Sequence, residues 1–114
     1  MERPNAWLTY SDADMQDLET VAKKYRHFLN VGKTERECIT QIVKEAEEAG
    51  YVSLEEKVKN GEALKAGDKV YQVGMQKIIA LYHMGEDDLA QGMNILCAHI
   101  DSPVSYTHLT LPTT

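Results

Sequence analysis

The segment Ala98-His99-Ile100-Asp101-Ser102-Pro103 holds the residue types best suited to metal chemistry. Side chains two positions apart on a strand point to the same side, so His99 and Asp101 are predicted to share a face. A neutral imidazole is a common zinc ligand, and a nearby carboxylate can accept its other ring N–H, which fixes the tautomer and raises the basicity of the ligand. Cys97 precedes them on the same face; its thiolate could be a further ligand, although packing inside a strand is the favoured interpretation. The pattern indicates a candidate metal site at a strand end.

Taken alone, the His-x-Asp pair also has a structural interpretation. A histidine at a strand-to-loop junction can be satisfied by a local carboxylate, and Pro103 then only ends the strand. Two other histidines, His27 and His83, are interpreted as an edge residue and a packing residue rather than as ligands. The pair therefore needs support from the rest of the chain before it indicates a function.

Three stretches ahead of this segment are predicted to be helical. Each begins with Ser or Thr followed three residues later by an acidic residue, which is the pattern of a capping box. Apolar residues recur in them at spacings of three and four, and the second and third stretches end at a glycine. The predicted helices cover residues 12–29, 34–50 and 53–61.

The sequence after residue 68 changes to a β pattern. Val70–Val73 and Lys77–Tyr82 are apolar stretches separated by a short loop containing glycine, the spacing of a β-hairpin. Met93–Ile100 is a nearly continuous apolar run, typical of a strand that is buried on both faces. The predicted class is therefore α/β, with amino-terminal helices followed by a β-hairpin and a buried strand.

Length and composition exclude several classes of protein. The chain has 114 residues, 12 Lys+Arg against 18 Asp+Glu and a net charge of −6, and no apolar run approaches the length of a membrane-spanning helix, about 20 residues. The acidic balance argues against nucleic acid or an anionic membrane surface as a partner. Two cysteines form no disulfide framework, and the first residues lack the layout of a signal peptide, so a cytoplasmic location is expected.

The last eleven residues, Val104 to Thr114, differ in composition from the rest. All the charged residues lie within residues 1–103, and the tail contains none. An exposed terminus is one interpretation. The other is that the tail is not native, because it resembles a translated sequencing-library adapter. We therefore expect a native part at 1–103 and a non-native tail at 104–114.

Four segments in order along the chain resemble the amino-terminal portion of the aspartyl aminopeptidase family of zinc metallopeptidases, metallopeptidase family eighteen. These segments are residues 33–38, 48–51, 64–71 and 92–103. The family motif is a His-x-Asp-Ser-Pro at a strand end, which this sequence has at His99 to Pro103. The resemblance implies a larger catalytic domain with helices around a mixed sheet.

The resemblance also implies roles for individual residues. His99 would be a ligand of one of two zinc ions, and Asp101 the catalytic-site carboxylate that orients it. The activity implied is removal of an amino-terminal residue, often an acidic one, from peptides, and full-length members are homo-oligomeric dodecamers. The family's remaining acidic ligands, general base and second histidine cannot be assigned in this chain, so we expect an inactive fragment that does not bind zinc stably.

Two other functions remain open from the sequence. One is a non-catalytic α/β interaction module in which His99 and Asp101 are only structural. The other is a different dinuclear zinc hydrolase of similar fold.

Overall fold

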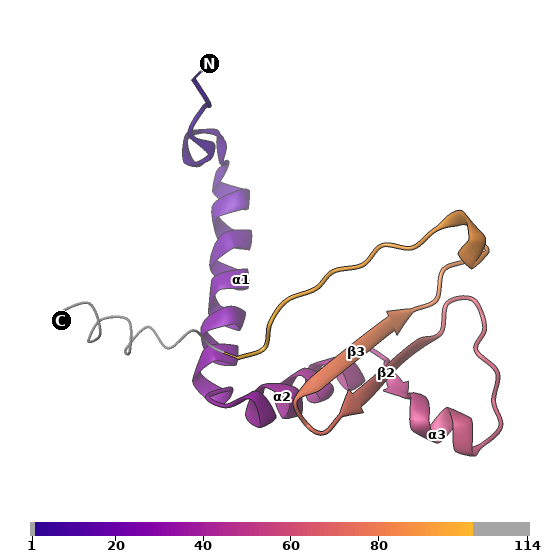
Figure 1. Cartoon of the computed structure of the whole chain (residues 1–114). Helices are drawn as coiled ribbons and strands as arrows, with labels where there is room; N and C mark the ends of the chain where they lie inside the picture. The colour runs from indigo at the N-terminus through magenta and orange to yellow at the C-terminus, as the bar shows by residue number, and fades with distance from the viewer. Residues whose placement is uncertain (1, 102–114) are drawn as a thin grey trace, which may run out of the picture. The chain divides into compact units, whose positions relative to one another are not determined.

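The computed structural model describes residues 2–101, which divide into two compact units within Met1–Val31 and Gly32–Thr114 (Figure 1). The predicted boundary at Pro103 and the tail at 104–114 lie outside the described residues. Along the described part of the chain, no helix is both long enough and apolar enough to cross a membrane.

The first unit consists of a short 3-10 helix, η1 (Ala6–Thr9), and a long helix, α1 (Asp12–Val31). The predicted capping box is confirmed: the Asp14 N–H donates to Ser11 Oγ at 3.2 Å, and the Ser11 N–H donates to the Asp14 carboxylate at 2.9 Å. This second bond lowers the pKa of the Asp14 carboxyl. The helix runs two residues past its predicted end, since Asn30 and Val31 are tolerated in a last turn.

Helix α2 (Glu35–Glu48) opens the second unit and agrees with the second predicted helix. Its cap is Thr34, whose side-chain oxygen accepts the Glu37 N–H at 3.3 Å. The helix ends before Gly50, which has a φ of +92°, a conformation that glycine adopts without strain. The buried residues of α2 lie on its predicted apolar side or next to it: Cys38, Ile39 and Ala46.

Helix α3 (Leu54–Lys59) confirms the third predicted helix, but its predicted capping box is wrong. Ser53 is the N-cap residue and makes no side-chain capping bond. Its backbone belongs at the same time to the two-residue strand β1 (Val52–Ser53), which pairs with the next strand. The sequence did not predict β1, because two residues are too few to show an alternating pattern.

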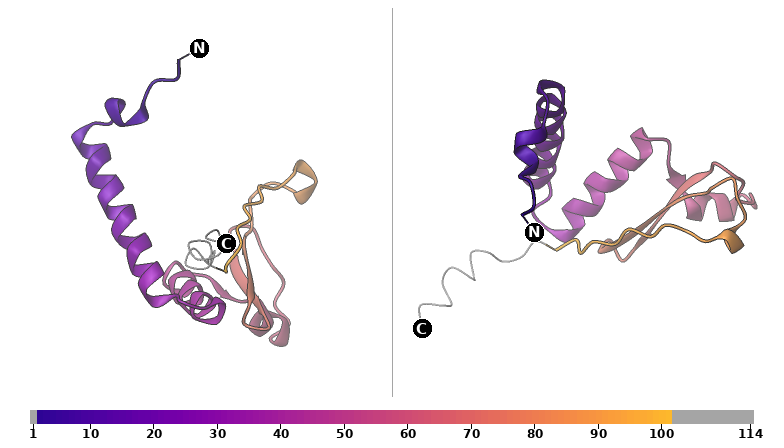
Figure 2. Two further views of the ribbon diagram at one scale, coloured as in Figure 1. Left: turned by 60° about the vertical axis from the view of Figure 1, so that its left-hand side comes forward. Right: turned by 90° about the horizontal axis from the view of Figure 1, so that it is seen from above.

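The sheet has three strands in the order β1-β2-β3. Strand β2 (Lys69–Gly74) pairs in parallel with β1 and antiparallel with β3 (Ile78–His83), so the sheet is mixed (Figure 2). Val70 lies in the middle strand and is fully buried. The hairpin is confirmed, with strand ends within one residue of those predicted.

The carboxyl-terminal end of α2 is bonded to β2 by two side chains of the strand. The Tyr71 hydroxyl donates to Glu47 Oε1 at 2.8 Å, and this bond raises the pKa of Tyr71. The Lys69 ammonium donates to the Ala49 carbonyl at 3.2 Å and lies 5.8 Å from the centre of the Tyr51 ring. These contacts hold helix and sheet together through polar groups at the rim of a small apolar core.

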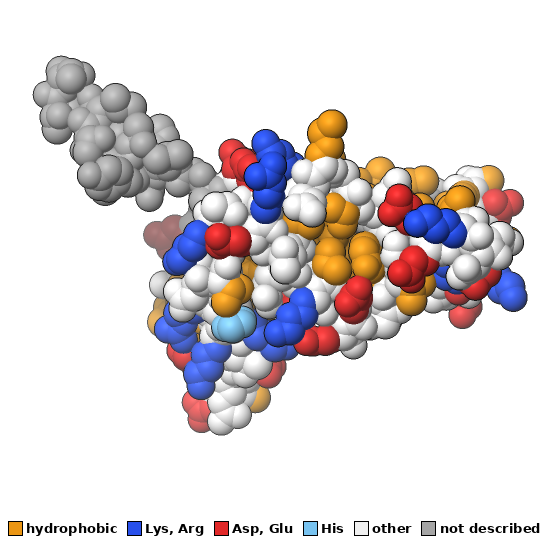
Figure 3. Space-filling view, turned by 90° about the horizontal axis from the view of Figure 1, so that it is seen from below, with side chains coloured by type: hydrophobic (Ala, Val, Ile, Leu, Met, Phe, Trp, Pro, Cys, Tyr) orange, Lys and Arg blue, Asp and Glu red, His pale blue; other side chains and the backbone are white. Residues whose placement is uncertain are grey.

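The prediction of a buried strand at Met93–Ile100 is wrong for this structure. The segment is extended without strand pairing, as its plain trace shows (Figures 1 and 2), and Ile95 and Leu96 are 73% and 97% exposed. A strand needs a neighbour for its backbone N–H and C=O groups, and no segment among residues 2–101 pairs with this one. Figure 3 shows hydrophobic side chains at the surface among charged ones, which fits a core with few buried residues.

The hairpin turn contains two residues that strain the backbone. Met75 and Gln76 have φ values of 51° and 56°, and the Lys77 N–H donates to the Gly74 carbonyl at 3.0 Å. Positive φ at both central positions is the pattern of a type I′ turn, which favours Asn followed by Gly. Neither Met nor Gln is suited to it, because a side chain in this region costs about 1 kcal/mol or more.

We expect the double substitution Met75→Asn and Gln76→Gly to stabilise the second unit by about 1 kcal/mol. Urea denaturation of the chain measures this difference. Gln72→Gly is the control, because it places glycine within a strand and should destabilise by up to about 1 kcal/mol. A loss of stability in the turn variant would contradict the assigned turn.

Candidate metal-binding segment

The structure brings His99 and Asp101 together, although not on a strand. His99 Nδ1 lies 2.7 Å from the backbone carbonyl oxygen of Asp101 and 3.3 Å from its carboxylate Oδ1. Both side chains are exposed, at 70% and 67%. Asp101 is therefore close enough in the chain, two residues after His99, to hold the imidazole of His99.

These contacts determine which ring nitrogen of His99 has the proton. A carbonyl oxygen can only accept, so at 2.7 Å the Nδ1–H must be the donor to Asp101. In the neutral ring Nε2 then keeps its lone pair, which is the form that coordinates a metal ion. Asp101 therefore holds the imidazole mainly through its backbone carbonyl oxygen, which lies closer than the carboxylate that was predicted to orient it.

The described residues do not complete a zinc site. A catalytic zinc ion normally has three protein ligands and a water molecule. Within residues 2–101 no three or more His, Cys, Asp or Glu side chains gather closely enough to hold a metal ion. Cys97 is a free, exposed thiol near His99, whereas the other cysteine, Cys38, is buried, with Sγ 3.6 Å from the Gly32 carbonyl oxygen. One oriented imidazole does not fit a resident zinc ion by itself.

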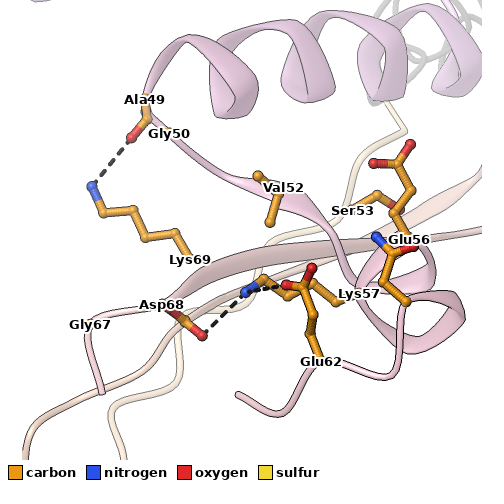
Figure 4. Close-up of a pocket in the computed structure, with 11 residues that line it drawn as sticks. Ala49, Gly50, Val52, Ser53, Glu56, Lys57, Glu62, Gly67, Asp68 and Lys69 are labelled. Carbon is orange, nitrogen blue, oxygen red and sulfur yellow. Dashed lines mark hydrogen bonds and ion pairs between the residues drawn. The ribbon is translucent and has the colours of Figure 1, made fainter. Parts of the chain in front are cut away.

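A second polar cluster, which the sequence did not predict, lies in a cleft of about 570 Å³ beside α3 and the start of β2 (Figure 4). Lys57 Nζ is 3.3 Å from Asp68 Oδ2 and 3.6 Å from Glu62 Oε2. The lysine side chain is only 18% exposed, while Lys69 on the other side of the cleft is bonded to a carbonyl oxygen. Both lysines already have partners. The cluster therefore stabilises the connection between α3 and β2, and neither lysine is free to bind a ligand.

Asp68 bonds both to helix α3 and to the turn that follows it. Its carboxylate accepts the Lys65 N–H at 2.9 Å and the Lys57 ammonium at 3.3 Å. The backbone bond from Lys65 is the main cause of a lowered pKa at Asp68, and the Lys57 contact lowers it further. No sequence signal pointed to this group, because its members meet only once the intervening turn has formed.

We expect Asp68→Asn to lower the thermal stability of the second unit at pH 7. Because the folded-state pKa lies below the ordinary value of 3.8, the ionised carboxylate stabilises above that value. This stabilisation is lost as the pH falls through the lowered pKa, so wild type and variant should converge at the acid end. Melting temperatures from pH 7 down to about pH 2 measure this, with the exposed loop variant Asp87→Asn as control. A constant difference at all pH values would contradict a role for the charge.

Comparison with known proteins identifies the class to which this segment belongs. Residues 28–107 match the family described as aminopeptidase I zinc metalloprotease (M18). The match covers most of the chain and includes His99 and Asp101, so the chain belongs to the M18 family. This confirms the resemblance found in the sequence.

Individual relatives agree with this assignment. A probable M18 family aminopeptidase 1 from Clostridium acetobutylicum is 40% identical over 90% of this chain and 22% of that protein. The crystal structure of aminopeptidase I from Borrelia burgdorferi B31 matches with a TM-score of 0.78 and 28% identity, over 88% of this chain and 24% of that one. An M18 aminopeptidase structure from Thermotoga maritima gives a TM-score of 0.74 and 35% identity, over 90% of this chain and 21% of that one.

These neighbours confirm the α/β class and its place within a larger domain. They also show that this chain spans less than a quarter of the length of the relatives it matches.

Proposed function

We propose that residues 1–103 are the amino-terminal part of the catalytic domain of a zinc-dependent aminopeptidase, and that His99 is one of its zinc ligands. The observation that supports this most directly is the orientation of the imidazole. Its Nδ1–H is held by Asp101, which leaves Nε2 available, and both residues lie inside the M18 match.

The proposed substrate is a peptide from which the amino-terminal residue is removed, with acidic residues preferred. The proposed working form is a homo-oligomer, a dodecamer by resemblance to the family, with two zinc ions in each site. The cytoplasmic location stays a prediction from composition. For the chain itself we propose no activity and no stable zinc binding, because the described residues supply a single oriented imidazole where three ligands are needed.

The experiment compares the 114-residue chain with the longer protein obtained by extending it through the genomic sequence downstream of Pro103. Zinc content and hydrolysis of aspartyl, glutamyl and leucyl p-nitroanilides are measured for both. We expect zinc and activity only in the longer protein, with the acidic substrates cleaved fastest. A longer protein that lacks zinc would favour the non-catalytic module, and zinc with no peptidase activity would favour a hydrolase of another class.

A further inference from the structure

We draw no further inference here: the strongest candidate, the apolar stripe of helix α1 that runs from Met15 to Leu29 without a buried residue, carries none, because nothing in the part of the chain that the structure describes shows what covers it.

Discussion

Given the proposed aminopeptidase activity of the longer protein, replacing His99 by Ala there should lower kcat/KM by about 10³ and reduce the zinc bound per chain. The substitution removes the Nε2 lone pair that the Asp101 contact leaves available. A metal ion supplies several kcal/mol of transition-state stabilisation in hydrolysis, and about 4 kcal/mol corresponds to a factor of about 10³. Zinc analysis and peptidase kinetics on the same preparation measure both effects.

Two further variants make this result specific. His83→Ala removes an exposed histidine at the end of β3 and should leave zinc and activity unchanged. Asp101→Asn keeps the backbone carbonyl 2.7 Å from Nδ1 and alters only the carboxylate at 3.3 Å, so it should cost about tenfold in activity or zinc affinity. If the His99→Ala protein kept its full zinc content, the assignment of His99 as a ligand would be wrong.

Replacing Val70 by Asp should unfold the second unit. Val70 has no exposed surface, lies in the middle strand and is paired with Val52 on one side and Tyr82 on the other. The new carboxylate would be buried without a partner, at a cost of about 4 kcal/mol or more. A core with only four buried apolar residues among those described has little stability to offset this.

The matched control is Val58→Asp on α3, where the valine is 69% exposed. The same chemical change should alter the free energy of unfolding there by less than about 1 kcal/mol. Urea denaturation followed by circular dichroism compares the two, with Val70→Ala, at about 2 to 3 kcal/mol, as an intermediate case that remains folded. Equal stability of Val70→Asp and Val58→Asp would contradict the burial assigned to Val70.

The parts of the fold that could be predicted from the sequence are those that local interactions determine. The capping residues Ser11 and Thr34 bond to backbone N–H groups three residues away, so a short window of sequence contains the whole signal. The same holds for the hairpin, whose strands are adjacent in the chain. Strand β1 could not be predicted, because its only β feature is a pairing with Val70 and Tyr71, which lie 18 residues further on.

The segment Met93–Ile100, by contrast, could not be predicted correctly from local sequence. Its apolar composition predicts a buried strand, but composition does not supply the neighbouring strand whose backbone must pair with it. His99 and Asp101 are in contact, as their spacing in the sequence predicted, while their roles at a zinc ion stay a prediction. The sequence could not predict the Lys57, Glu62 and Asp68 cluster, because that cluster depends on the turn between α3 and β2.

The two cysteines differ in exposure, so their reactivity can be used to measure how well each one is shielded from solvent. A thiol-specific label should react quickly with Cys97 and slowly with Cys38, a residue that is only 4% exposed. Because Cys97 is two residues from His99, its labelling rate reports directly on whether the surrounding segment is shielded. Alkylation followed by mass spectrometry would therefore distinguish, at a single atom, the open segment of this chain from a sheltered one in the longer protein.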